Sequence, residues 1–141
     1  MKKLLFFAFL AVAMIACDKN QRAVKKLEGT WNATKALTTE PTFGLTIDLL
    51  GDPVNGSMSF TFENCKLKDD EWCNVSSTIS VFGDTESDNS LYKVTNDGTQ
   101  IEVLDSAGTA NIITIQELTN TEMKATWIDD ETTIEMELEK Q

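Results

Sequence analysis

Ile134-Glu135-Met136-Glu137-Leu138-Glu139, close to the C-terminus, alternates an apolar side chain with a carboxylate over its whole length. Successive side chains of an extended strand point to opposite faces, so the apolar set would share one face and the carboxylates the other. A helix would instead spread both sets around its circumference. The stretch therefore predicts a β-strand with one face in a core and one in water.

Three further runs show the same period of two. Their apolar members are Met58, Phe60 and Phe62 in the first run, Val75, Ile79 and Val81 in the second, and Met123, Ala125 and Trp127 in the third. Mostly serine, threonine or lysine stands between them, and Ser77 falls on the apolar side of the second run. We expect each run to be a half-buried strand.

Turn signals separate these runs at hairpin spacing. They are Asn96-Asp97-Gly98, Ser106-Ala107-Gly108, Thr119-Asn120 and Asp129-Asp130. Tight connections make consecutive strands antiparallel. We expect eight or nine strands, near residues 30–38, 43–50, 57–63, 73–81, 90–95, 99–104, 109–118, 122–128 and 132–139. The pattern predicts an all-β fold, either a closed antiparallel up-and-down β-barrel of about eight strands or a β-sandwich.

The N-terminus carries a targeting signal. Met1-Lys2-Lys3 is cationic, residues 4–15 form an unbroken apolar run, and Ala16-Cys17 follows. The run is too short for an ordinary membrane span and is typical of a secretory signal. Met14-Ile15-Ala16-Cys17 resembles the signal of bacterial lipoproteins, which implies cleavage before Cys17 and a lipid on its sulfur. An incidental Cys17 behind an ordinary signal is the alternative.

The lipoprotein signal sets the expected organisation and location. Residues 1–16 would be the signal peptide, 17–26 the lipidated cysteine and tether, and 27–141 the barrel domain. The tether is polar through Arg22, and residues 23–27 could form a short helical turn. Several acyl chains hold a protein on its membrane. We expect a lipid anchor in the bacterial cell envelope, at the outer membrane. Asp18, which follows the cysteine, does not decide which leaflet of the membrane carries the anchor.

Cys65 and Cys73 remain as an even pair once Cys17 is set aside. They flank a polar segment, residues 66–72, that is typical of a hairpin tip, and Asp69-Asp70-Glu71 within it is expected to be hydrated. In an oxidising envelope this pair predicts a disulfide. A metal site is the competing interpretation, but the chain has no histidine and two thiols alone make a poor zinc site. We expect neither a metal nor a cofactor.

The charge of the chain excludes several classes of function. The sequence holds 12 Lys and Arg against 23 Asp and Glu, and removal of residues 1–16 leaves 10 against 23, a formal charge of −13. Such a domain repels phosphate backbones, so we expect no nucleic-acid partner. Without histidine, triads built on an imidazole base are excluded. No spacing selects an acid–base pair among the carboxylates, and we expect no enzyme.

Residues 84–90 place acidic oxygens at alternate positions, as a calcium-binding loop does. The loop pattern also requires a glycine at its sixth position and a glutamate at its twelfth, and Asn89 and Thr95 stand there instead. We therefore interpret residues 84–90 as a solvated loop.

Leu27-Glu28-Gly29-Thr30-Trp31 opens the first predicted strand directly after the leader. This Gly-x-Trp, followed by consecutive hairpins, resembles the lipocalin-like lipoproteins of Gram-negative bacteria over roughly residues 27–141. The resemblance implies a lipocalin-like barrel. In lipocalins an arginine late in the chain packs over the first-strand tryptophan, but the only arginine here is Arg22, which precedes the barrel. The two alternatives are that Lys124 or Lys140 covers Trp31 by a weaker cation–π contact and that this chain lacks the feature.

An eight-stranded barrel is either filled by its own side chains or holds one small ligand. The candidate lining is Trp31, Met58, Phe60, Phe62, Val75, Ile79, Val81, Met123, Trp127, Ile134, Met136 and Leu138. Fold analogy favours a carrier or sequestering protein for a small apolar or amphiphilic molecule. The alternative is a structural or interaction lipoprotein with a side-chain-filled barrel that binds another envelope protein through its rim loops.

Overall fold

The computed structural model describes residues 19–52, 54–65, 72–129 and 131–141. Within these ranges the chain forms helix α2 (Lys19–Leu27), the 3₁₀ turn η1 (Asn96–Gly98) and nine strands. The strands are β1 (Gly29–Glu40), β2 (Leu45–Asp48), β3 (Ser57–Phe62), β4 (Cys73–Val81), β5 (Asp84–Thr95), β6 (Gln100–Leu104), β7 (Ala110–Leu118), β8 (Glu122–Asp129) and β9 (Thr132–Lys140). The predicted signal peptide, Cys17 and the Asp69-Asp70-Glu71 tip lie outside the described residues.

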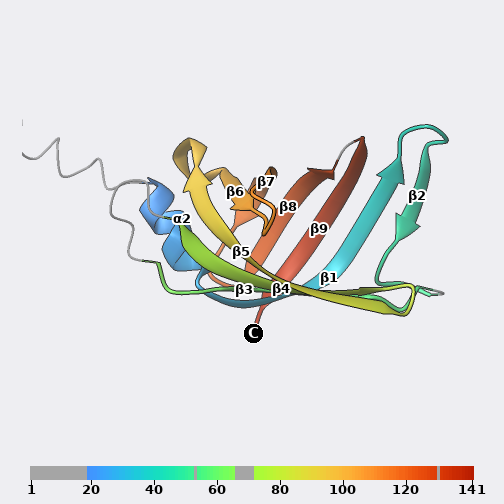
Figure 1. The fold of residues 1–141 in the computed structure, drawn as a ribbon, viewed down its shortest axis with the longest axis horizontal. Helices are drawn as coiled ribbons and strands as arrows, with labels where there is room; N and C mark the ends of the chain where they lie inside the picture. The colour runs from blue at the N-terminus through green and yellow to red at the C-terminus, as the bar shows by residue number, and fades with distance from the viewer. Residues whose placement is uncertain (1–18, 53, 66–71, 130) are drawn as a thin grey trace, which may run out of the picture.

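Eight strands close into an antiparallel barrel in the order β1-β3-β4-β5-β6-β7-β8-β9, with β9 returning to β1 (Figure 1). The closing ladder runs from Trp31 opposite Lys140 to Thr39 opposite Thr133. The prediction of a closed all-β barrel is confirmed, and the sandwich alternative is wrong. The short strand β2 lies outside the closed ring and pairs only with the last residues of β1.

The antiparallel order sorts the connections to two ends of the barrel. Helix α2, η1 and residues 119–121 lie at one end, which we call the closed end. The tips of the β1–β2, β4–β5 and β6–β7 hairpins lie at the other end, which we call the mouth. In Figure 1 the helix and the β4–β5 tip accordingly stand at opposite extremes of the molecule.

Helix α2 covers the closed end with one apolar face. Ala23, Val24 and Leu27 are buried in the core. At η1, Gly98 donates its backbone N–H to Asn20 Oδ1 at 2.7 Å, and a β-carbon on Gly98 would stand 3.2 Å from that of Ala23. A nine-residue helix is marginal alone in water, so docking on the barrel holds it.

The helix begins at Lys19, four residues earlier than the predicted turn at Ala23. The sequence indicated a polar tether through Arg22 because that segment has no apolar stripe of its own. The tertiary contact of Asn20 with η1 orders it instead. Among the described residues, no helix has the length and hydropathy of a membrane span.

Trp31 is fully buried where the helix meets the first strand. Its indole Nε1 donates to the carbonyl of Leu27 at 2.7 Å. Of the two lysines considered, Lys140 covers the ring, with its Nζ 5.4 Å from the ring centroid. The same Nζ donates to the carbonyl of Lys26 at 2.9 Å, which ties the last strand to the end of the helix.

Residues 84–90 form the first half of strand β5 and not the solvated loop that we expected. They pair with β4 in a hairpin that turns at Phe82 and Gly83, both in the left-handed region with φ of 54° and 88°. Side chains from Asp84 to Asn89 are exposed, so no burial pattern marks the strand in the sequence. Hydroxyl pairs such as Ser80 with Thr85, at 2.7 Å, bridge the two strands in place of apolar contacts.

Candidate functional site

A cavity of about 150 Å³ lies inside the barrel on the mouth side. Side chains from the seven strands β3 to β9 line it. The lining is Phe60, Phe62, Val75, Ser77, Ile79, Asp88, Ser90, Val103, Asp105, Asn111, Ile113, Trp127 and Met136. The barrel is therefore filled at its closed end and hollow toward its mouth.

The structure divides the predicted lining residues into two groups. Phe60, Phe62, Val75, Ile79, Trp127 and Met136 line the cavity. Trp31, Met58, Val81, Met123, Ile134 and Leu138 belong to the core or pack against it without reaching the cavity. Large side chains at the closed end, above all Trp31 and Leu138, fill the barrel there under helix α2.

Sequence reasoning missed the polar half of the cavity. Asp88 and Ser90 on β5, Asp105 after β6 and Asn111 on β7 line it. Asp88 and Ser90 share the parity of buried Tyr92 and Val94 along the same strand, and a period of two extended backward from Tyr92 would have placed them inside. The cavity thus combines an aromatic and aliphatic wall with polar groups nearer the mouth.

The two carboxylates of the cavity are held by local hydrogen bonds. Ser90 donates its hydroxyl to Asp88 Oδ2. Thr109 donates its backbone N–H to Asp105 Oδ1 at 2.7 Å, which also ties the β6–β7 turn together. Neither aspartate has a Lys or Arg partner among the described residues. A ligand in the cavity therefore meets two carboxylates that no cation of the described chain neutralises.

Trp127 contributes an unusual polar atom to this wall. Its indole Nε1 is buried and has no hydrogen-bond acceptor within the part of the chain that the structure describes. Leaving a buried donor unpaired costs about 1–3 kcal/mol. Such groups in folded proteins are exceptions that point to a water or a ligand. Less than 1 Å² of this nitrogen is accessible, so an acceptor atom in the cavity would reach it only after a small shift of the neighbouring side chains.

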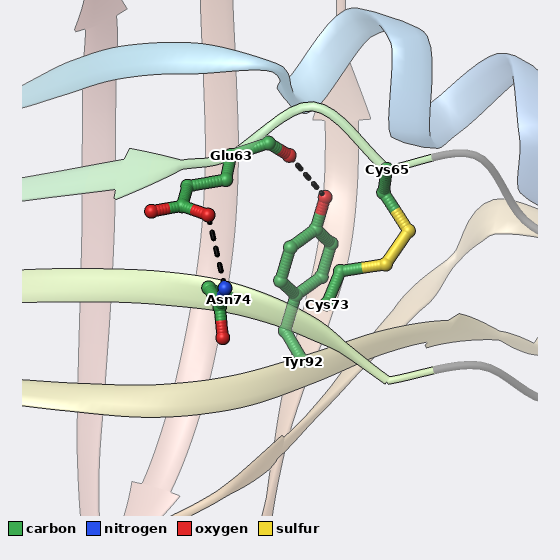
Figure 2. The surroundings of a disulfide bond; sticks show 5 residues. All are labelled: Glu63, Cys65, Cys73, Asn74 and Tyr92. Atoms are coloured by element: carbon green, nitrogen blue, oxygen red, sulfur yellow. Dashed lines mark hydrogen bonds between the residues drawn. A yellow bond between two sulfur atoms is a disulfide. The ribbon is translucent and has the colours of Figure 1, made fainter.

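Tyr92 and the Cys65–Cys73 disulfide lie close together beside the β3–β4 connection at the closed end (Figure 2). The predicted Cys65–Cys73 disulfide is confirmed, with the two Cα atoms 5.7 Å apart. Tyr92 is fully buried, its hydroxyl donates to the Glu63 carbonyl at 3.4 Å, and its ring meets Phe62 edge-on at 5.0 Å between centroids. Burial and, to a lesser degree, the charge of Glu28 raise the pKa of Tyr92 to about 12.

Charge is unevenly distributed along the barrel. The described residues of the four segments nearest the mouth, 40–52 with 54–56, 79–91, 103–113, and 128–129 with 131–135, contain ten Asp and Glu and no Lys or Arg. Helix α2 at the closed end contains four Lys and Arg in nine residues and no acidic residue. Within the described residues, no group of three or more Cys, Asp or Glu is placed to hold a metal ion.

The rim of the mouth carries exposed apolar side chains. Phe43 in the β1–β2 connection is 85% exposed, Phe82 at the β4–β5 tip 67%, and Ile128 at the end of β8 60%. None of the three lines the 150 Å³ cavity, and they stand on separate hairpins.

Comparison with protein families and with curated proteins found no match to this chain. Its function has to be argued from the cavity, the charge distribution and the N-terminal sequence.

Proposed function

We propose that this protein is a lipid-anchored, non-catalytic binding protein of the bacterial envelope whose barrel takes up a small molecule. The ligand has an apolar group, a hydrogen-bond acceptor and no negative charge. The cavity, with its apolar wall, unpaired Trp127 donor and two carboxylates, is the observation that carries the proposal. The Gly29-Thr30-Trp31 resemblance to lipocalin-like lipoproteins supports the binding role by analogy.

The size of the cavity limits the buried part of the ligand. A hollow of about 150 Å³ is below the usual range of drug-sized pockets. Apolar protein cavities of that volume accommodate a benzene ring. The ligand therefore inserts one ring or a short branched alkyl group, and the rest of the molecule projects toward the mouth.

The charge of the cavity selects against anions. Asp88 and Asp105 face the cavity, and the segments around the mouth carry carboxylates without a single cation. Like charge at a binding site costs affinity and lowers the rate of encounter. A neutral or cationic molecule meets no such barrier, whereas a fatty acid would bring its carboxylate to the most acidic part of the protein.

A matched ligand series tests the proposal. Toluene, benzyl alcohol, benzylamine and benzoate share one ring and differ only in the polar group. We expect the full-chain protein to bind the alcohol and the amine at least tenfold more tightly than benzoate, measured by calorimetry or tryptophan fluorescence. Absence of binding by all four at millimolar concentration to the folded protein would refute the cavity as a site.

A Trp127→Phe variant tests the contribution of the indole N–H to ligand affinity separately from that of the apolar wall. Phenylalanine keeps most of the ring surface but removes the indole N–H. We expect benzyl alcohol affinity to fall about threefold to tenfold, in line with one lost hydrogen bond, and toluene affinity to change little. An equal loss for both ligands would show that Trp127 contributes shape alone.

The anchor has its own test. Cys17→Ser removes the sulfur that the lipid would occupy, so the variant should move from the membrane fraction to the soluble fraction. Mass spectrometry of the N-terminal peptide of the parent protein should find the acyl chains. Unchanged membrane retention of the variant would contradict the proposed anchor.

A second function, docking of an envelope protein on the rim, is favoured by Phe82. Its φ of 54° is costly for a bulky side chain, and its ring is two-thirds exposed. Phe82→Asn removes the aromatic group, and asparagine adopts the positive φ of this turn more readily. Loss of a co-purifying partner from this variant would therefore not result from misfolding. Retention of that partner by Phe82→Asn would exclude this tip as the contact.

A further inference from the structure

We infer that the closed end of the barrel is a contact surface for anionic lipid headgroups, so that the protein stands on its membrane with the mouth pointing away. This inference rests on the anchor proposed at Cys17. It goes beyond that anchor because it assigns a side-chain surface, a lipid chemistry and an orientation.

Helix α2 has a cationic outer face. Ala23, Val24 and Leu27 occupy the buried side, and Lys19, Arg22 and Lys25 are exposed. Neither Arg22 nor Lys25 forms an ion pair with a described residue. Lys19 pairs with Asp97 at 3.3 Å, but both side chains are more than two-thirds exposed, so a phosphate can replace the aspartate at little cost.

A shallow hollow beside the helix offers room for a headgroup. Its volume is about 270 Å³, and Lys19, Arg22 and Lys26 border it together with Thr99 and Gln116. Asp97 and Glu117 also border it, and Lys19 and Lys124 respectively pair with them. Lys26 already donates its Nζ to the Leu118 carbonyl at 3.0 Å. Arg22 is therefore the cation of this hollow that is left to bind a phosphate.

The chain places this surface next to the proposed lipid. One residue separates Cys17 from Lys19, and two chain steps span at most about 7 Å. The acyl chains would therefore start beside the cationic face of α2. A basic patch adjoining acyl chains is a recognised two-signal arrangement for stable binding to anionic membranes.

The opposite end of the molecule reinforces the orientation. The described residues of the segments at the mouth include ten acidic side chains and no cation, so an anionic surface repels them while it attracts α2. A protein with a net charge of −13 after signal removal can still orient in this way, because the separation of its charges and not their sum determines the torque. The cavity then opens toward the aqueous side and away from the anchoring membrane.

Lysine labelling of the reconstituted protein tests the contact. The full-chain protein is purified from membranes and placed in vesicles of phosphatidylcholine alone or with 30% phosphatidylglycerol, and acetylation is followed by mass spectrometry. We expect Lys19 and Lys25 to react at least fivefold more slowly in the anionic vesicles. Lys35 and Lys124, half-exposed on the barrel wall, serve as internal controls and should react equally in both.

Two variants and salt complete the test. Arg22→Gln should weaken the protection of Lys19 and Lys25, whereas Lys35→Gln, with the same change in net charge and an ion-pair partner, Glu137, that does not border the hollow, should leave it intact. Sodium chloride at 0.5 M should abolish the protection because it screens the headgroups. Equal labelling of Lys19 and Lys25 in both vesicles would overturn the inference, as would equal protection of Lys35 and Lys124.

Flotation separates failure of the inference from failure of the anchor. A protein that floats with neutral vesicles but shows no selective protection retains the anchor and lacks the headgroup surface. A protein that floats only with anionic vesicles, and has no lipid on Cys17, retains the surface and lacks the anchor. Flotation with neither composition would overturn both.

Discussion

Gly29, Trp31 and Lys140 depend on one another at the closed end. Gly29 has a φ of +116°, a backbone conformation that side chains with a β-carbon rarely adopt. A β-carbon there would stand 2.9 Å from Lys140 Cε, the stem whose ammonium covers the Trp31 ring. The Gly-x-Trp pattern therefore has a physical reason: the glycine admits the lysine that packs on the tryptophan.

Gly29→Ala should destabilise the fold by roughly 1–3 kcal/mol, because it strains the backbone and displaces Lys140. Denaturation followed by tryptophan fluorescence measures the loss. Gly108→Ala is the matched control, since Gly108 also has a positive φ of 84° but no atom within 4 Å of the added carbon. Equal losses in the two variants would show that the Lys140 contact contributes nothing.

Tyr92 makes the stability of the protein sensitive to alkaline pH. The folded state keeps the phenolic proton up to a pKa of about 12, whereas the unfolded chain loses it near 10. Between these values the folded state binds more protons, so the free energy of unfolding falls as pH rises, by on the order of 2 kcal/mol. Below pH 10 this contribution is fully present.

Tyr92→Phe removes the titrating group and should flatten the stability curve between pH 10 and 12. Urea denaturation at half-unit steps of pH provides the comparison, and the difference between the two proteins cancels the titration of the lysines. Parallel curves for the two proteins over this interval would contradict the assignment to Tyr92.

At the scale of elements, the Cys65–Cys73 bridge clamps the β3–β4 connection over a separation of eight residues. Loop-closure entropy assigns such a short loop roughly 2–3 kcal/mol. We expect the Cys65→Ser, Cys73→Ser double variant to lose about that much stability in chemical denaturation. Reductant should lower the parent protein to the level of the variant and leave the variant unchanged. A reductant-insensitive parent would contradict a stabilising role.

Strands in which apolar and polar residues alternate could be predicted from the sequence, and strands without this alternation could not. Strand β9 lies at residues 132–140 against a predicted 132–139, because Ile134, Met136 and Leu138 alternate with glutamates. The side chains from Asp84 to Asn89 are all exposed, including Asp88 where it borders the cavity, so no apolar alternation distinguishes this half of β5 from a loop. Pairing with β4 across the turn at Phe82 and Gly83 makes it a strand, and no apolar alternation in residues 84–89 signals that pairing.

At the scale of the whole molecule, the mouth is acidic, and the basic residues of helix α2 lie at the closed end. Asp88→Asn with Asp105→Asn removes two negative charges from the cavity and preserves the shape and one acceptor oxygen of each side chain. We expect benzoate affinity to rise at least threefold and benzylamine affinity to fall, by calorimetry at low salt, where exposed charges are least screened. Unchanged affinity for both ligands would show that the two carboxylates do not set selectivity.

The apolar half of the candidate site was visible in the sequence, and its polar half was not. Phe60, Val75 and Trp127 belong to alternating runs, and alternation placed them inside. The apolar alternation is interrupted at Asp88, Asp105 and Asn111. Because these side chains are polar, the sequence indicated that they face the solvent. They face the cavity because the period of two continues through them once the strands are paired.

The sequence alone determined the class of fold, most of the strands and the disulfide pair, because these depend on neighbours close along the chain. The tertiary structure decided which strands close the ring, where the helix begins and which polar residues turn inward. These features join residues far apart, such as Trp31 with Lys140 or Asn20 with Gly98. Local periodicity predicts which face of a strand is buried. Closure of the barrel determines whether that face packs into the core or encloses the cavity.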